Sequence, residues 1–206
     1  MFVRSVRGYL PLLVVFALAG ALFVGSARAA TDAGGFLAEF SDQAIAELTA
    51  PGISDAEKER RFRALIDEGF DIPAIGKFVI GRYWRNTDTA EQQDFLTTFR
   101  DMMVYRFLPI FGEYSGERLK VGIVRPFATG SNISNVSSEL VRTQGEPVPV
   151  DWRILYADGG YKIVDIIAVG VSIAVTLRSE YTSVLKSNGG DVGALTRVLR
   201  KKIVGG

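Results

Sequence analysis

Asp165 is the residue whose type and position raise most directly the question of chemistry. It lies in an apolar stretch, residues 161–169, whose valines and isoleucines predict a β-strand. A carboxyl group between apolar neighbours can act as a general base, as in small cone-shaped isomerases. The structural alternative is a carboxylate paired with Arg153 or Arg178. We expect the structural role, in which Asp165 and Arg178 tie the strand to the helix after it. The functional alternative is that the pair contacts the polar part of a ligand.

Two residue types that carry much of enzyme chemistry are missing, because the sequence has no histidine and no cysteine. Their absence excludes a thiol nucleophile and a Ser-His-acid triad. A zinc site would need carboxylates alone, and no clustered spacing of acids suggests one. No glycine-rich phosphate loop follows a predicted strand. We therefore predict no catalytic residue, no metal and no cofactor, and keep an enzyme with Asp165 as its base as an alternative.

The stretch that contains Asp165 is predicted to be a β-hairpin that continues directly into a helix, over residues 147–181. Residues 158–160, Asp-Gly-Gly, supply the turn. Alternating apolar residues share one face of the first strand: Val148, Val150, Trp152, Ile154 and Tyr156. The second strand is apolar on both faces, with Ile163 on one and both Val164 and Ile166 on the other. Such a strand needs a cover on each side.

The first 29 residues have the features of a cleaved signal peptide. Arg4 and Arg7 form a basic start, residues 10–24 form an apolar run, and residues 27–29, Ala-Arg-Ala, match a cleavage motif. The run is shorter than the roughly 20 residues that a membrane-spanning helix needs. We predict a signal peptide over residues 1–29 with cleavage before Ala30, and one domain over residues 30–206.

Composition and charge indicate an ordered domain with no affinity for nucleic acid. The chain has 206 residues, of which 48% are hydrophobic and 23% charged, and these are globular proportions. Loss of Arg4, Arg7 and Arg28 with the signal peptide would change the net charge from +1 to −2. The mature chain therefore has no basic excess for nucleic acid. Without cysteine, an exported protein must rely on its hydrophobic core alone.

Apolar spacing and turn residues predict an α+β fold. Helices are expected at residues 36–48, 54–69, 71–80 and 88–107, and again at 171–187 and 191–203. Period-two alternation predicts four antiparallel strands, at residues 118–127, 133–142, 148–156 and 161–169. Ser54, Asp71, Asp88 and Asp191 are placed to begin helices. Pro109 bends or ends the fourth helix.

Aromatic and methionine residues are concentrated between residues 78 and 114. Most of them are expected to fill an ordinary core. Flexible methionines such as Met102 and Met103, between Phe99 and Tyr105, also suit a pocket for a floppy apolar ligand. The residues alone thus point to a small exported α+β protein, with a carrier of lipophilic molecules among its possible functions.

Two motifs add a family resemblance. Residues 75–81, Ile-Gly-Lys-Phe-Val-Ile-Gly, are followed by Tyr83-Trp84-Arg85, and residues 161–165, Tyr-Lys-Ile-Val-Asp, are followed by residues 170–173, Gly-Val-Ser-Ile, and by Arg178-Ser179. Together they resemble the MlaC family, also called the toluene-tolerance or auxiliary phospholipid-binding family. The similarity covers about residues 36–203.

The resemblance implies a periplasmic lipid carrier that performs no chemistry on its ligand. It implies N-terminal helices, a four-stranded curved antiparallel sheet and C-terminal helices that enclose an apolar cavity. The implied partners are an inner-membrane ABC transporter with an MCE-domain component and an outer-membrane complex that donates or accepts the lipid. Bound lipid would be the cargo.

Departures from the family pattern resemble its hopanoid-associated branch, HpnM. Leu177 replaces a frequent aromatic residue before Arg178, Ile80 replaces a usual leucine, and Tyr161 replaces a frequent tryptophan. The C-terminal tail is also short. The cargo is therefore expected to be a phospholipid or a hopanoid.

The lipid is expected to contact apolar side chains of the sheet and of the helix at residues 88–107. Phe78 and Tyr83 would lie near the mouth, and Val171 and Ile173 would point back over the cavity. The full predicted set is Phe78, Tyr83, Phe99, Met103, Val150, Trp152, Ile154, Val164, Ile166, Val171 and Ile173. A slip of one residue in a strand would exchange the inward and outward sets.

A third hypothesis is a periplasmic adaptor that binds no lipid and uses its apolar patches as protein interfaces. It predicts a filled core and a flat apolar surface patch. Like the enzyme with Asp165 as base, it stays an alternative at this point.

Overall fold

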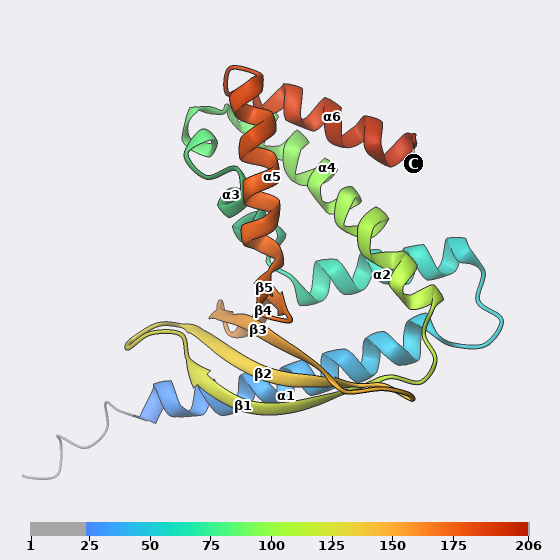
Figure 1. Cartoon of the computed structure of the whole chain (residues 1–206). Coiled ribbons are helices and arrows are strands. Elements are labelled where there is room, and N and C mark those ends of the chain that lie inside the picture. Colours follow the sequence, from blue (N-terminus) through green and yellow to red (C-terminus); the bar gives the residue numbers. More distant parts are fainter. Residues whose placement is uncertain (1–23, 206) are drawn as a thin grey trace, which may run out of the picture.

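A computed structural model describes residues 24–205 and has an α+β fold (Figure 1). The helices are α1 (Val24–Leu48), α2 (Asp55–Gly69), α3 (Ile72–Ile80), α4 (Thr89–Phe107), α5 (Ile173–Ser187) and α6 (Val192–Val204), with 3₁₀ turns η1 (Gly81–Asn86) and η2 (Leu108–Gly112). The strands are β1 (Arg118–Pro126), β2 (Ile133–Val141), β3 (Val148–Ala157), β4 (Gly160–Ala168) and β5 (Val171–Ser172). The predicted fold class is confirmed.

The structure describes only the last part of the predicted signal peptide, residues 24–29. Residues 1–23 of the predicted signal peptide lie outside the described residues. The predicted cleavage point before Ala30 falls within α1, which begins twelve residues earlier than the helix predicted from residue 36. Cleavage stays a prediction. Within residues 24–205, no helix is both long and apolar enough to cross a membrane.

Helix starts follow the predicted capping residues. Ser54, Asp71, Asp88 and Asp191 each accept a hydrogen bond from the backbone N–H three residues further on. Such a bond satisfies one of the unpaired N–H groups of a first turn. Pro109 stands in η2, directly after α4 ends at Phe107, as expected for a residue that cannot continue an α-helix.

The sheet is antiparallel throughout and has five strands in chain order, one more than predicted. The fifth is the short β5, which the sequence reading placed inside the next helix. A two-residue turn, Val169-Gly170, folds β5 back onto β4, and both turn residues have positive φ, at 50° and 79°. Helix α5 begins at Ile173 with no loop between.

A bulge in β4 corrects the predicted strand faces. The register pairs Arg153 with Asp165 but Ile154 with Ile163, so one extra residue, Val164, interrupts the alternation. A bulge shifts the faces of all residues beyond it. Ile163 and Ile166 consequently share one face, whereas the sequence reading put them on opposite faces. Val164 packs instead against the helices.

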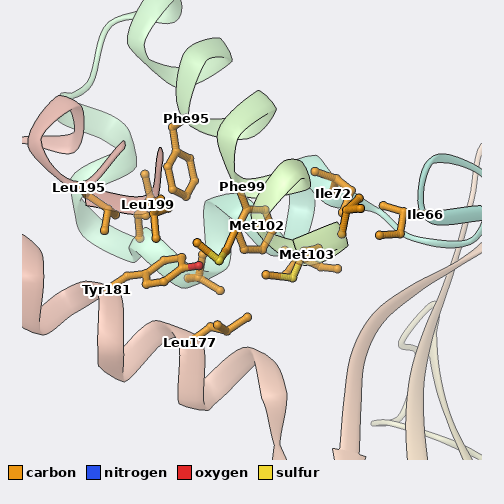
Figure 2. Packing of buried hydrophobic residues seen from close by; sticks show 14 of the residues in the cluster. Ile66, Ile72, Phe95, Phe99, Met102, Met103, Leu177, Tyr181, Leu195 and Leu199 are labelled. Atoms are coloured by element: carbon orange, nitrogen blue, oxygen red, sulfur yellow. The ribbon is translucent and has the colours of Figure 1, made fainter. Parts of the chain in front are cut away.

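Two hydrophobic clusters hold the fold. The larger, here called the helix cluster, lies among α2, α3, α4, α5 and α6, and Figure 2 shows its rings Phe95, Phe99 and Tyr181 beside one another. Phe95 and Phe99 stack at 5.8 Å, and both meet Tyr181 edge to face. The smaller, the sheet cluster, joins α1 to one face of the sheet. Its buried members are Ala33, Leu37, Val136, Ile154 and Ile163.

The α2–α3 junction seals part of the edge of β4 and joins the two clusters. The N–H of Asp71 donates to the carbonyl of Ile163 at 3.0 Å, and Phe70 forms a parallel bridge with the same residue. Lys162 donates through Nζ to the carbonyl oxygens of Asp67 and Glu68. The sheet is thereby fixed to the helices along β4.

Candidate functional site: an apolar sheet face beside a buried carboxylate

Asp165 is buried where β4, β5 and α5 meet, and it is only 5% exposed. Its Oδ2 accepts hydrogen bonds from Ser172 Oγ at 2.6 Å and from Arg153 Nη1 at 3.1 Å, and its Oδ1 accepts from the N–H of Ala174 at 3.0 Å. The N-terminal end of a helix favours a negative charge. With both oxygens engaged, Asp165 joins the sheet to α5, and it lacks the wet, open surroundings that the enzyme hypothesis requires.

The partner of Asp165 is Arg153 and not Arg178, which corrects the predicted pair. The register places Arg153 directly opposite Asp165 on the neighbouring strand, whereas Arg178 lies in the second turn of α5. Its Nη1 donates to the carbonyl of Phe78 at 3.0 Å, and its guanidinium lies 4.8 Å from the centre of the Phe78 ring. Arg178 therefore caps the C-terminal end of α3, where a cation is favourable.

Hydrophobic side chains line the sheet face that contacts α1. The pairing register sets Val124, Val136, Trp152 and Ile166 in one row across β1, β2, β3 and β4. Gly34 lets α1 approach closely, since a Cβ there would lie 2.9 Å from Val124 Cγ2. The predicted residues Val150 and Ile154 lie in the two adjoining rows of the same face.

In the row through Val136 the cover decreases from β2 toward β4, whereas Ile154 on β3 and Ile163 on β4, in the adjoining row, are fully buried. Val136 is fully buried under α1, whereas Trp152 and Ile166, its neighbours in the row, are only partly buried. Partly buried apolar residues surround this row: Phe36, Phe40, Phe70, Leu119, Val121, Val124 and Tyr161. The described part of the sheet cluster is thus an incompletely closed core. α1 lies chiefly against β1 and contacts β2 and β3 less (Figure 1).

Trp152 is held in place by a polar group within this apolar face. Its Nε1–H donates to Ser138 Oγ at 2.9 Å, and that hydroxyl donates to the carbonyl of Val150 at 2.6 Å. Ser138 is buried, and both of its interactions are satisfied. The indole ring therefore has a fixed orientation, and its apolar surface stays available beside Ile166.

A family model described as MlaC protein matches residues 38–201. The chain belongs to the MlaC family.

Known proteins of similar sequence or fold agree with this membership. The intermembrane phospholipid transport system binding protein MlaC of Haemophilus influenzae is 18% identical over 186 residues, which cover 87% of this chain and 86% of that protein. A phospholipid-binding protein from Ralstonia solanacearum, solved in complex with a phospholipid, has 21% identity and a TM-score of 0.72. That match covers 84% of this chain and 97% of the other.

In this MlaC-family chain, the predicted residues of the helices, and Val164 of β4 with them, lie apart from the open face. Phe99 and Met103 are buried in the helix cluster, and Val164 and Ile173 pack against it. Tyr83 lies at the margin of this cluster, against the turn between α5 and α6, since a Cβ on Gly190 would lie 3.0 Å from its ring. A lipid-contacting role for these residues stays a prediction.

Phe78, predicted near the mouth, and Val171, predicted to point back over the cavity, are both exposed. Phe78 is 40% exposed on α3 and stacks with Arg178, and Val171 is 60% exposed on β5. Neither belongs to the sheet cluster. The structure thus divides the predicted set among the open sheet face, the packed helix cluster and the outer surface.

The sequence reading missed a line of aromatic rings beside the open face. Phe36 lies 5.8 Å from both Phe40 and Tyr161, and Phe40 meets Phe70 edge to face at 6.1 Å. Phe36 and Phe40 have helical i, i+4 spacing, which placed them on one face of the first helix but did not indicate its partner. The contact to Phe70 depends on tertiary structure.

Away from the open face, this MlaC-family chain has a hollow, and its described side chains also allow a search for a metal site. A hollow of about 400 Å³ at the α1–α2 turn is lined by Leu48, Thr49, Ala50, Gly52, Ile53, Lys58, Phe111 and Tyr114, none of them a predicted site residue. Among the side chains that the structure describes, no group of three acidic, His or Cys residues could hold a metal ion.

Proposed function

We propose that this MlaC-family protein is a periplasmic carrier that binds a membrane lipid and shuttles it between membrane complexes without chemical change. The observation that carries the proposal is the incompletely covered apolar face of β3 and β4, where Trp152 and Ile166 lie beside the fully buried Val136. An apolar face of this kind needs a cover, and an acyl chain or a polycyclic lipid supplies one.

Burial of the hydrocarbon supplies the binding free energy. At roughly 0.8 kcal/mol per buried CH₂, one sixteen-carbon acyl chain contributes on the order of 12 kcal/mol before ordering costs. No catalytic side chain is needed. The lipid leaves when a membrane or a partner protein offers an equally apolar environment, so the carrier works by exchange between similar environments.

The cargo class is a phospholipid or a hopanoid. The solved relative from Ralstonia solanacearum holds a phospholipid, which supports the first. The partly buried Val150, Trp152 and Ile166 form the floor that we assign to the hydrocarbon part, and Ile154 is fully buried beside it. Phe99 and Met103 would be reached only if the packed helix cluster opened, because both are buried there.

The partners that we propose are membrane complexes on either side of the periplasm. They are an inner-membrane ABC transporter with an MCE-domain component and an outer-membrane donor or acceptor. The name of the Haemophilus influenzae relative, a binding protein of an intermembrane phospholipid transport system, supports this assignment. The predicted signal peptide over residues 1–29 supports export.

Native mass spectrometry of protein purified from its own cells tests the carrier function, with extraction to identify any lipid. We expect a bound lipid in the wild-type protein. In Ile166→Gln, a polar side chain enters the open face, and bound lipid should fall at least about tenfold, since burial of an Ile side chain is worth about 1.5–3 kcal/mol.

Ile123→Gln is the matched control, because Ile123 is 58% exposed on β1 and lies outside the sheet cluster. It should keep its lipid. Wild-type protein without any lipid, or equal loss from both variants, would contradict the proposed function.

A further inference from the structure

The apolar sheet face that we assign to the lipid is closed at one end and open at the other. Ser134, Ile154 and Ile163 form a row across β2, β3 and β4, and all three are buried. Leu140 and Val148 are paired at the other end of β2 and β3, and both are only half-buried. The cover therefore decreases along these strands toward the β2–β3 turn.

A lipid on this face has one direction in which its polar end reaches water. The gap over Trp152 is bounded on one side by the buried row that contains Ile154. Beyond that row, the rings of Phe36 and Tyr161 lie 5.8 Å apart. Burial of a polar headgroup among such groups costs free energy, because it loses its hydrogen bonds to water. The headgroup of a lipid on this face would therefore lie toward the turn at residues 142–147.

Arg142 stands at this open end, one residue beyond β2. The alternation of side chains along the strand places it on the same face as Ser138 and Leu140. Its Nε and Nη2 both donate to the backbone carbonyl of Glu146, at 3.1 and 2.7 Å. A guanidinium has five N–H donors, so three of them have no acceptor among the described residues. The side chain is thus held at the turn by one neutral group.

No carboxylate in the described part of the chain forms an ion pair with Arg142. Glu146 lies in the same turn, but its backbone carbonyl is the atom that contacts the guanidinium. Glu117 accepts hydrogen bonds from Ser115, whose hydroxyl lies 3.5 Å from that of Thr143. The exposed guanidinium of Arg142 therefore stays available to an anion at the end of an apolar floor.

We propose that Arg142 binds the phosphate of the carried lipid, whose hydrocarbon lies along the floor from Val148 toward Trp152. A guanidinium suits this group, because it binds phosphate through two parallel N–H···O bonds. The proposal rests on the proposed carrier function and names the class of its cargo. A phospholipid presents a phosphate at this end, whereas a polycyclic lipid without phosphate offers the guanidinium no anion.

The hollow at the α1–α2 turn is the competing headgroup site. Its lining contains one cation, Lys58, which also makes no ion pair within residues 24–205. Leu48 and Phe111 of the same lining belong to the helix cluster and not to the sheet cluster. The hollow therefore offers a cation beside the helix cluster, whereas Arg142 stands at the end of the open sheet face.

Two lipids with the same acyl chains separate the headgroup contact from the hydrocarbon contact. Protein expressed from the full chain and freed of lipid is titrated with phosphatidylglycerol or with diacylglycerol, and native mass spectrometry measures the bound fraction. Arg142→Gln should weaken binding of phosphatidylglycerol about tenfold, because hydrogen bonds to a charged group are lost. Its binding of diacylglycerol should be unchanged. Equal weakening for both lipids would show damage to the turn and overturn the proposal.

Arg118→Gln is the matched control, because Arg118 is also exposed and unpaired in the described chain but pairs in register with Val141 and so lies on the opposite face. It should bind both lipids like the wild type. Lys58→Gln tests the hollow, and a loss of phosphatidylglycerol binding there, with none in Arg142→Gln, would move the headgroup site to the hollow. Inorganic phosphate should not bind measurably. Its binding through Arg142, with unchanged binding of phosphatidylglycerol, would replace the lipid headgroup by free phosphate and overturn the proposal.

The position of bromine atoms along the acyl chain tests the orientation separately. In Trp84→Phe, Trp152 is the remaining tryptophan, and it lies about 13 Å along β3 from Val148. Bromines near the chain end should therefore quench its fluorescence more than bromines near the ester groups, and the reverse order would contradict the orientation. Wild-type protein that binds neither lipid would contradict the carrier function itself. Equal affinity of wild type and Arg142→Gln for phosphatidylglycerol would contradict the headgroup contact alone.

Discussion

The helix cluster and the sheet cluster are built from similar residues but are closed to different degrees. In the helix cluster, Phe95, Phe99 and Leu195 are fully buried, and three aromatic rings contact one another at its centre. In the sheet cluster, Val136 is fully buried, but Trp152 and Ile166 in the same row are not. The closed cluster stabilises the fold, and the open one is the surface that we propose for the lipid.

The contacts that connect the two clusters explain how the sheet cluster can stay open while the helix cluster stays rigid. Asp165 on β4 accepts hydrogen bonds from Ala174 of α5, from its N-cap Ser172 and from Arg153 of β3, and Phe40 and Phe70 belong to the margins of both clusters. The sheet is thus fixed along its β4 edge, and α1 covers it from the β1 side. The remaining gap in the cover lies over Trp152 of β3 and Ile166 of β4, since Ile154 and Ile163 on the same strands are fully buried.

The largest expected effect is on the closed cluster. Phe99→Ala should lower the free energy of unfolding by about 3–5 kcal/mol, because it leaves a cavity among packed rings. Ile166→Ala, in the open cluster, should lower it by only about 1–2 kcal/mol, since part of that side chain already meets solvent. Urea unfolding of both variants measures the difference. Equal losses would show that the two clusters are equally closed.

Removal of the buried carboxylate should have the next largest effect. Asp165→Ala should lower the free energy of unfolding by about 3 kcal/mol, because it leaves Arg153 without its carboxylate partner and the N–H of Ala174 without an acceptor. Asp88→Ala is the control, since Asp88 caps α4 in an exposed position, and it should lose about 1 kcal/mol. A loss in Asp165→Ala as small as in the control would contradict a structural joint.

Overpacking at the other joint should have a smaller effect. A Cβ at Gly69 would lie 2.3 Å from Phe40 Cζ, so Gly69→Ala must displace this ring. The expected loss is about 1–3 kcal/mol, with a change in near-ultraviolet circular dichroism from the aromatic rings. Gly35→Ala is the control in the neighbouring helix, because a Cβ there meets nothing within 4 Å. An unchanged spectrum of Gly69→Ala would argue against the ring contact.

The smallest expected effect is a dependence on pH at the surface of α2. Hydrogen bonds from Arg60 and Arg61 lower the pKa of Glu57 from its ordinary value of 4.5 to about 2. Because the folded pKa is the lower one, the stabilisation is complete above pH 4.5 and is lost as the pH falls toward 2. The difference in unfolding free energy between wild type and Glu57→Gln should shrink over this range. A constant difference would contradict the shift.

Local chemistry allowed much of the fold to be predicted from the sequence. Four helices start at Ser54, Asp71, Asp88 and Asp191. In each, the capping side chain accepts a hydrogen bond from the backbone N–H only three residues further on, so the start can be predicted from the local sequence. The α+β class and the first four strands followed from the change of apolar period. The family motifs added the MlaC resemblance, which the family match confirms.

The parts that depend on register or tertiary contact were not predictable. The bulge at Val164 adds one residue and reverses the faces beyond it, and nothing in the local sequence marks it. The choice of Arg153 over Arg178 as partner of Asp165 depends on the same register. β5 was hidden because a valine, and not the Asn or Gly that two-residue turns favour, stands at the first position of its turn. The rings of Phe40 and Phe70 meet only through the fold.

The central claim is that lipid covers the open sheet face, and the two tryptophans of the chain allow a direct test. Trp152 lies on that face, whereas Trp84 lies at the margin of the helix cluster. The variants Trp84→Phe and Trp152→Phe each leave one fluorescent reporter, and a phospholipid with brominated acyl chains quenches only a ring that it contacts. We predict strong quenching of Trp152 and little of Trp84. Quenching of Trp84 with none of Trp152 would contradict this account.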